Sequence, residues 1–306
     1  MAKLLDGKWV RGEILKDLAP RLERLKTEAR PPGLAVVLVG ENPASAVYVR
    51  NKVQACQELG IYSEKLTPPA TVTTAEMREI VSGLNARPEI DGILVQMPLP
   101  PQVDTQAVLE TISPVKDVDG FHPLNLGTLV SNRPGPRPCT PSGIMELLRR
   151  YEIPVQGRRA VVLGRSDIVG KPMALLLLHA HATVTLCHSR TKELDEECRR
   201  ADILVAAIGR PGLVRGDWIR AGAVVVDVGI NRVSERTLAL DFFRDDPARQ
   251  AAFDKSGSSL VGDDHPAEVG HAAAYTPVPG GVGPLTIAML MANTVAIAER
   301  RLGLTA

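Results

Sequence analysis

The chain has 306 residues, of which 44% are hydrophobic and 23% charged; this ordinary globular composition excludes a disordered protein. Lys and Arg (36) nearly balance Asp and Glu (35), and only 3% of the residues are aromatic. With no positive field and few stacking platforms, we expect neither nucleic acid nor a membrane as a partner. The length exceeds what one hydrophobic core usually organises, so about two domains are expected.

The cysteines are widely spaced and form no C-x-x-C pair, which favours buried small hydrophobes in a reducing compartment. The N-terminal residues form no apolar signal core, and no stretch reaches the roughly 18 uninterrupted apolar residues of a membrane span. We therefore expect a cytoplasmic protein. The four cysteines are Cys56, Cys139, Cys187 and Cys198.

In the first half of the chain, short β-branched runs alternate with helical stretches, a pattern that predicts βαβ units and a parallel sheet. A loop rich in Pro and Gly at 131–139 marks the expected domain boundary. The predicted strands are 34–39, 62–66 and 92–96, and the predicted helices are 44–59 and 74–86.

The second half repeats this alternation and predicts a second doubly wound, Rossmann-type unit. The polar segment 233–259 has weak periodicity and is expected to be a surface excursion, whereas the apolar last helix, 285–301, is expected to pack back on the first domain. The predicted strands are 159–163, 183–187, 203–207 and 223–228, after a helix at 142–151.

The turn from Gly164 to Gly170 connects a predicted apolar strand to a predicted helix, where free N–H groups and a positive dipole end can hold a pyrophosphate. The motif departs from G-x-G-x-x-G because Ser166 occupies the second glycine position. By itself, such a turn is as often structural, since tight turns between strands and helices need glycine.

The end of the next predicted strand indicates which dinucleotide binds. An NAD-specific fold places a carboxylate there against the ribose 2′-hydroxyl, but this chain has His188, Ser189 and Arg190. Ser189 can donate a hydrogen bond to a 2′-phosphate, and Arg165 or Arg190 can supply charged donors. These residues favour NADP over NAD, the alternative being solvated polar residues at a strand end.

Candidate catalytic residues lie in the first domain. Tyr48 and Lys52 are four residues apart on a predicted helix and share a face, although such a pair is more often an ordinary surface lysine beside a tyrosine. Gln96 ends a predicted strand, where ligands gather in parallel sheets. The 116–120 loop carries two carboxylates, which a plain turn would also explain, and the glycines of 276–284 permit close backbone approach to a flat ligand.

Together these motifs resemble the bifunctional methylenetetrahydrofolate dehydrogenase/methenyltetrahydrofolate cyclohydrolase family, and they follow one another in order along most of the chain. The five motifs are Tyr48-x-x-x-Lys52, Gly92-Ile-Leu-Val-Gln-Met-Pro-Leu-Pro100, Lys116-Asp-Val-Asp-Gly120, Gly164-Arg-Ser-Asp-Ile-Val-Gly170 and Pro277-Val-Pro-Gly-Gly-Val-Gly-Pro284.

The resemblance implies two α/β domains with parallel sheets and a substrate cleft between them. Residues 1–139 plus 276–306 would form the folate-binding catalytic domain, and 140–275 the NADP-binding Rossmann-type domain. It implies oxidation of 5,10-methylenetetrahydrofolate with NADP, hydrolysis of the methenyl product to 10-formyltetrahydrofolate, and a homodimer. Alternatives are a non-catalytic dinucleotide sensor and a dehydrogenase acting on a hydroxy acid or a shikimate-like acid.

The resemblance also implies residue roles. Lys52 would position or activate water and assist ring opening, Gln96 would hold Lys52, Asp119 would accept the N–H edge of the pterin, and Tyr48 would stack on the aminobenzoyl ring. Folate would also contact Pro279, Gly280 and Gly281, whereas the cofactor would contact Gly164, Arg165, Ser166, Ser189 and Ile230.

Two features depart from the family pattern. The segment 232–260 is longer and more polar than expected, and Gly262-Asp-Asp264 replaces the more usual Gly-Asp-Val. Asp263, Asp264 and His265 could suggest a metal, but without a second cluster of ligands we expect a solvated loop and no metal site.

Overall fold

The computed structural model describes residues 2–304, which form two compact units. Unit 1 comprises the residues up to Arg11 and Thr140–Thr286, and unit 2 comprises Gly12–Cys139 and the residues from Ile287. Residues 2–11 and 276–286 therefore lie with the dinucleotide-type unit, whereas the sequence had placed them in the first domain. The reason is that strand β1 (Lys3–Leu4) pairs in parallel with β11 (Ala274–Tyr275).

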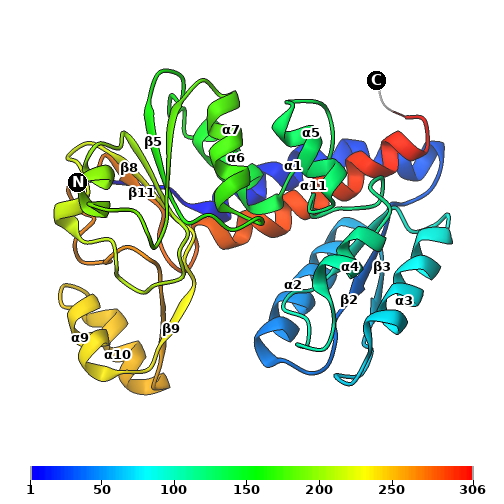
Figure 1. The fold of residues 1–306 in the computed structure, drawn as a ribbon, viewed down its shortest axis with the longest axis horizontal. Helices are drawn as coiled ribbons and strands as arrows, with labels where there is room; N and C mark the ends of the chain where they lie inside the picture. The colour runs from blue at the N-terminus through cyan, green and yellow to red at the C-terminus, as the bar shows by residue number, and fades with distance from the viewer. Residues whose placement is uncertain (1, 305–306) are drawn as a thin grey trace. The chain divides into compact units, whose positions relative to one another are not determined.

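Unit 1 contains a six-stranded sheet in the order β1-β11-β8-β7-β5-β6, and every pair in it is parallel (Figure 1). Alternate residues of its strands face two separate apolar clusters: Val161 and Leu163 lie in one, Ala160 and Val162 in the other. The sheet is therefore covered on both faces, as parallel sheets require. Its remaining strands are β5 (Arg159–Leu163), β6 (Thr183–Cys187), β7 (Ile203–Ala206) and β8 (Val224–Asp227).

Helices connect and cover these strands. Residues of α6 and α7 pack in one cluster, and residues of α8 and the short helix η1 flank the other. This arrangement confirms the predicted doubly wound unit. The bounds are α6 (Cys139–Arg150), α7 (Gly170–His179), α8 (Leu194–Arg199) and η1 (Gly216–Trp218).

The polar segment after β8 forms an arm with its own small core. Strands β9 (Asn231–Val233) and β10 (Ser259–Val261) pair antiparallel and lead to helices α9 (Arg236–Phe242) and α10 (Pro247–Ser256) (Figure 1). Phe242, Phe243 and Phe253 are the large members of its buried cluster. We call residues 231–261 the arm; it is more ordered than its weak periodicity predicted.

Unit 2 holds a three-stranded parallel sheet in the order β3-β2-β4. Strand β2 is buried along its whole length, as expected of the central strand of a parallel sheet. The strands are β2 (Gly33–Val37), β3 (Tyr62–Leu66) and β4 (Gly92–Val95), and the helices are α1 (Gly7–Glu28), α2 (Pro43–Leu59), α3 (Thr74–Ala86), α4 (Thr105–Thr111) and α5 (Pro123–Val130).

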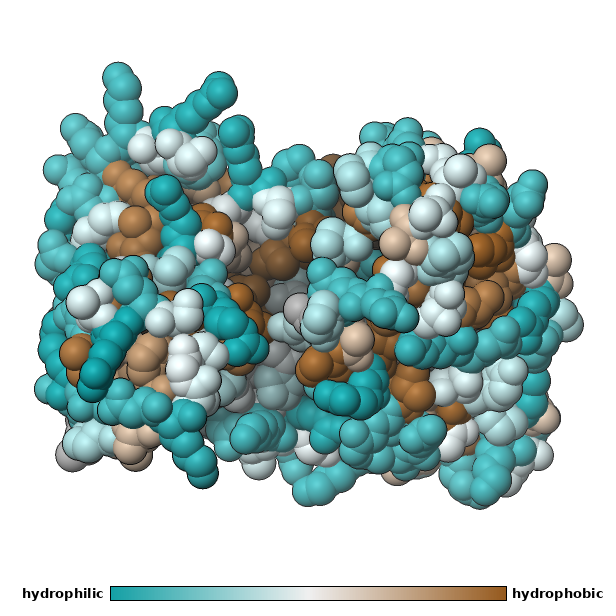
Figure 2. Space-filling view, turned by 90° about the horizontal axis from the view of Figure 1, so that it is seen from below, coloured by the Kyte–Doolittle hydropathy of each residue, from teal (hydrophilic) through white to brown (hydrophobic). Residues whose placement is uncertain are grey.

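The last helix, α11 (Val282–Arg301), is long and apolar enough to span a membrane by length and composition, yet half of that stretch is buried. Within unit 2, Met291 Sδ lies 3.7 Å from Cys56 Sγ, and Arg301 donates to the Asp91 carboxylate at 2.6 Å. Packing in a protein core accounts for its apolar character. On the face shown in Figure 2, hydrophobic side chains lie interspersed among hydrophilic ones.

Candidate active site

Lys52 and Gln96 meet in unit 2. Helix α2 begins at Pro43, one residue before the predicted start, and Asn42 caps it by accepting from Ser45 N. The helix carries Lys52, which is only 8% exposed. Lys52 Nζ donates to Gln96 Oε1 at 3.0 Å. Gln96 Nε2 donates to the Met97 carbonyl at 2.8 Å, so the amide is oriented with its oxygen toward the lysine.

Asp119 lies near this pair, with its side chain only partly exposed to solvent. Burial raises the pKa of Asp119 to about 6; the Lys52 charge opposes this shift and the Asp117 charge adds to it. Cys139 Sγ lies 4.0 Å from Asp119 Oδ1, and Asn293 Nδ2 donates to the Val118 carbonyl at 2.8 Å. Asn293 was missed from the sequence because it belongs to α11, far along the chain.

The other charged residues of the 116–120 loop are structural. Asp117 accepts from the N–H groups of Gly120 (3.0 Å) and His122 (2.8 Å) and from Asn125 Nδ2 (2.8 Å). The buried Lys116 donates to three carbonyls at the end of α3, those of Leu84, Asn85 and Arg87. Of the two carboxylates in the loop, Asp119 is therefore the one left for a ligand.

Tyr48 lies one turn before Lys52 on α2, and its side chain is 41% exposed. An exposed ring has a face available for stacking against a flat ligand. Tyr48 and Lys52 thus share one helix, with the tyrosine on the surface and the lysine buried.

In unit 1, a cavity of about 570 Å³ lies at the carboxyl ends of β5, β6 and β7. Gly164, Arg165, Ser166 and Ser189, four of the five residues expected to contact the cofactor, line it, and Arg190 does not. Ser166 Oγ accepts from Val169 N (3.2 Å) and Gly170 N (3.3 Å) at the start of α7. No acidic side chain is among the lining residues, so nothing in the wall repels a 2′-phosphate.

Glycine is required at both ends of this turn. Gly164 has φ of 113°, and a Cβ there would lie 2.1 Å from the Ala207 carbonyl oxygen. A Cβ on Gly170 would lie 1.9 Å from the Gly164 carbonyl oxygen. The turn therefore brings its backbone close to the adjacent loop, and the residues present fit a bound dinucleotide.

The cavity also includes residues that the sequence analysis missed, namely Ile208, Arg210 and Leu213. They follow β7, so their place after the next strand of the sheet could have indicated them. The buried Asp263 carboxylate holds their loop: Oδ2 accepts from Ile208 N (2.7 Å) and Gly209 N (3.0 Å), and Oδ1 from Arg210 N (2.7 Å).

This finding corrects the expectation of a solvated loop. Asp263, Asp264 and His265 are 0%, 5% and 0% exposed. Asp263 is buried because the N–H groups of another loop satisfy its charge. Within residues 2–304, no three His, Cys, Asp or Glu side chains are grouped so that they could hold a metal ion.

The remaining predicted residues lie in unit 1, apart from the cofactor cavity. Ile230 follows β8 and is 46% exposed. Pro279, Gly280 and Gly281 precede α11; the Gly280 carbonyl accepts from Gly7 N at 3.0 Å, and Gly281 N donates to the Pro277 carbonyl at 2.8 Å. These bonds hold the glycine loop in one conformation.

Comparisons with known proteins agree with this geometry. The family described as tetrahydrofolate dehydrogenase/cyclohydrolase matches through its catalytic domain at residues 5–119 and its NAD(P)-binding domain at 138–302. A curated relative from Solibacter usitatus, the bifunctional protein FolD, is 63% identical over 304 residues and covers 99% of each chain.

Two solved structures are also similar. The bifunctional FolD enzyme of Campylobacter jejuni is 43% identical, with a TM-score of 0.89, covering 98% of this chain and all of its own. The Trypanosoma brucei enzyme, solved with NADP cofactor and an inhibitor, is 39% identical with a TM-score of 0.87, covering 98% of each chain.

Proposed function

The chain belongs to the tetrahydrofolate dehydrogenase/cyclohydrolase family, and from this premise we propose how its residues carry out the two reactions. The enzyme oxidises 5,10-methylenetetrahydrofolate with NADP and hydrolyses the 5,10-methenyl product to 10-formyltetrahydrofolate. When bound, NADP accepts the hydride; the residues below bind, orient and move protons.

Lys52 is the residue that acts in the hydrolytic step. Its ammonium group has three donors and gives one to Gln96, which leaves the others for water or a folate nitrogen. Lys52 would place the attacking water at the methenyl carbon and assist opening of the five-membered ring. The Lys52–Gln96 hydrogen bond is the observation that carries this assignment.

Two parts of folate with different chemistry, the polar pterin and the aromatic aminobenzoyl group, would fix its orientation. Asp119, with no strong hydrogen bond of its own, would accept the N–H edge of the pterin, and the exposed ring of Tyr48 would stack on the aminobenzoyl group. Pro279, Gly280 and Gly281 would contact the folate through backbone, since glycine allows close approach.

On the cofactor side, Arg165 and Ser189 would bind the 2′-phosphate, the Gly164–Ser166 turn the pyrophosphate, and exposed Ile230 the nicotinamide ring. The shared cavity of Arg165 and Ser189 supports this assignment. An assay with methylenetetrahydrofolate, run in parallel with NADP and NAD, should show faster turnover with NADP. Equal rates with both cofactors would contradict the 2′-phosphate contact.

We also propose a cytoplasmic homodimer. Strand β6 ends the unit 1 sheet with Leu186 38% exposed, and Leu178 of the adjoining helix α7 is 54% exposed. An uncovered edge strand with apolar neighbours suits pairing with a second copy. Light scattering after size-exclusion chromatography should give twice the mass of 32.9 kDa, and a monomer would contradict the proposal.

A further inference from the structure

A second cavity of unit 1, of about 430 Å³, shares no lining residue with the cofactor cavity. It is enclosed by the arm, by the loop that follows the arm and by the loop 275–279. Phe242, Phe243, Pro266 and Pro277 give it apolar walls. Of the residues assigned above to the substrate or the cofactor, only Pro279 lines this cavity.

One carboxyl group in the cavity wall is uncommitted. Asp264 is 5% exposed, its backbone N–H donates to Asp227 Oδ2 at 2.8 Å, and its side chain makes no hydrogen bond to any other residue in 2–304. The main chain is therefore fixed while the carboxyl group is left for an occupant of the cavity. Burial raises the pKa of Asp264 to about 7, as expected for a carboxylate without a counter-ion.

The other charged groups of the cavity already have partners. Asp246 accepts from Arg249 N at 3.0 Å, and the Arg249 guanidinium lies 4.1 Å from the centre of the Phe243 ring while donating to the Leu260 carbonyl at 2.6 Å. Asp245 pairs weakly with Arg244, at 3.8 Å. With Asp245, Asp246 and Asp264 against Arg249, the lining carries a net negative charge when Asp264 is ionised.

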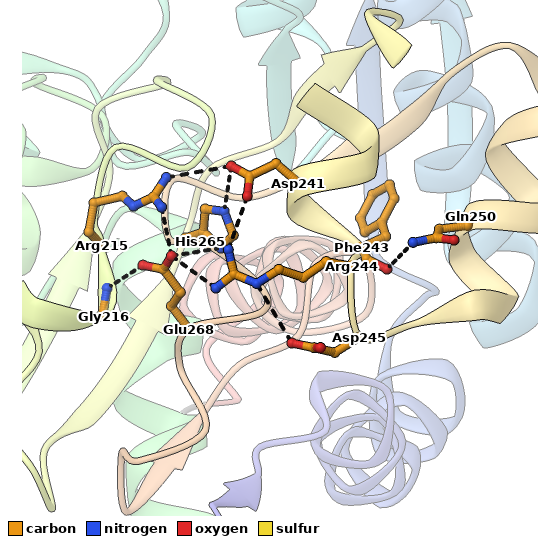
Figure 3. A network of polar contacts seen from close by, with 9 residues as sticks. All are labelled: Arg215, Gly216, Asp241, Phe243, Arg244, Asp245, Gln250, His265 and Glu268. Carbon is orange, nitrogen blue, oxygen red and sulfur yellow. Dashed lines mark hydrogen bonds and ion pairs between the residues drawn. The ribbon is translucent and has the colours of Figure 1, made fainter. Parts of the chain in front are cut away.

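A polar network, in which His265 is buried and both arginines are partly exposed, holds the arm that forms this wall (Figure 3). Glu268 accepts from Arg215 (2.6 Å), Arg244 (3.1 Å) and Gly216 N (2.8 Å). His265 Nε2 lies 3.2 Å from Asp241 Oδ2 of α9. The cavity is therefore bounded by a fixed arm and not by a loose surface loop.

The unpartnered carboxyl group and the arm meet in this one cavity. Asp264 lines the cavity, and Phe242, Phe243, Asp245, Asp246 and Arg249 of the arm line it as well. We propose that the cavity binds a small organic cation, an amine or amidine on a flat apolar body, with Asp264 as its counter-ion. Such a cation requires apolar walls for its body and a carboxylate that no other cation neutralises.

The site would also communicate with folate. Pro277 and Pro279 line the cavity and continue into Gly280 and Gly281, which were assigned above to the substrate. An occupant would therefore change the KM for methylenetetrahydrofolate; this second part rests on the proposed function.

Calorimetry with benzamidine as the probe tests the site, and benzoate, of similar shape but opposite charge, serves as the matched ligand. At a pH above the pKa of Asp264, we expect benzamidine to bind and benzoate not to bind. Asp264→Asn should weaken benzamidine binding about tenfold or more, the loss of one charge-assisted hydrogen bond. Asp264→Val, which removes both carboxyl oxygens, should do the same. Asp254→Asn, at an exposed position of the arm, should leave binding unchanged.

Equal binding of benzamidine and benzoate, no benzamidine binding, or full binding by the folded Asp264 variants would overturn the proposal. If neither variant folds, the comparison of the two ligands on the unmodified protein decides. The measurement involves no folate or NADP, so its failure is distinct from failure of the proposed reactions.

Discussion

Lys52 Nζ lies 3.0 Å from Gln96 Oε1, which joins helix α2 to the end of strand β4. The partner is a neutral amide whose other end is fixed to the Met97 carbonyl, so it orients the lysine without neutralising it. A carboxylate here would form an ion pair and hold the ammonium away from substrate. The pair therefore gives a buried lysine that is positioned but still available for chemistry.

Cofactor choice should depend on Arg165 and not on Arg190. Arg165→Ala should raise the KM for NADP about ten- to a hundredfold, because one charged hydrogen bond to phosphate is worth about 1.5–3 kcal/mol. The KM for NAD should change little. Arg190→Ala is the matched control, since Arg190 does not line the cavity. Equal losses with both cofactors in Arg165→Ala would argue against a 2′-phosphate contact.

Folate binding should weaken in acid through Asp119. Its pKa is raised to about 6, so the charged form that accepts the pterin N–H groups is lost as pH falls through that value. The KM for methylenetetrahydrofolate should rise below about pH 6. Because the folded pKa is above the ordinary value, protonation of Asp119 stabilises the fold as pH falls from 6 toward 4, so the titration of this group does not itself cause unfolding. The Asp119→Asn variant should have a high KM for methylenetetrahydrofolate at every pH. A KM that depends on pH as it does in the unmodified protein would contradict the assignment.

Asp263 should act as a positioning residue for the cofactor. Asp263→Asn replaces one acceptor oxygen by a donor facing backbone N–H groups, which loosens the 208–210 loop. The KM for NADP should rise several-fold, while hydrolysis of methenyltetrahydrofolate, which needs no cofactor, should be retained. Asp217→Asn, at an exposed position, is the control. Parallel loss of both activities would instead indicate general misfolding.

Lys116 should contribute to stability and not to chemistry. Burial lowers its pKa to about 8, and its ammonium group satisfies three carbonyls at the end of α3. Lys116→Met should lower the free energy of unfolding by about 2 kcal/mol, since those carbonyls lose their donor. Lys26→Met, at an exposed position on α1, should change it by less than about 0.5 kcal/mol. Urea titration of the two variants measures the difference, and equal midpoints would contradict the capping role.

Local patterns were sufficient to predict most elements. The strands at 62–66, 159–163 and 183–187 and the helix at 74–86 have the predicted bounds. The helix is marked by a capping box, in which Thr73 and Glu76 bond reciprocally.

What could not be predicted depends on contacts between distant residues. Because its sequence neighbours are polar, Asp263 was expected to be exposed to solvent. Its carboxylate instead accepts four hydrogen bonds, from residues 208–210 and 231. The arm appears polar because only a few residues, chiefly Phe242, Phe243 and Phe253, form its core. Strand β1 likewise joins the unit 1 sheet by pairing with β11, some 270 positions away along the chain. No local sequence pattern predicts this pairing.

The role of Lys52 is tested most directly by measuring the rates of hydrolysis and of oxidation in the Lys52→Met variant. Methionine is uncharged and similar to lysine in length. Methenyltetrahydrofolate hydrolysis should fall at least about a hundredfold, the usual range for loss of a proton-transfer group. NADP-dependent oxidation of methylenetetrahydrofolate should retain a much larger share of its rate, because the hydride goes to the cofactor. Equal loss of both rates in the folded variant would contradict the role assigned to Lys52.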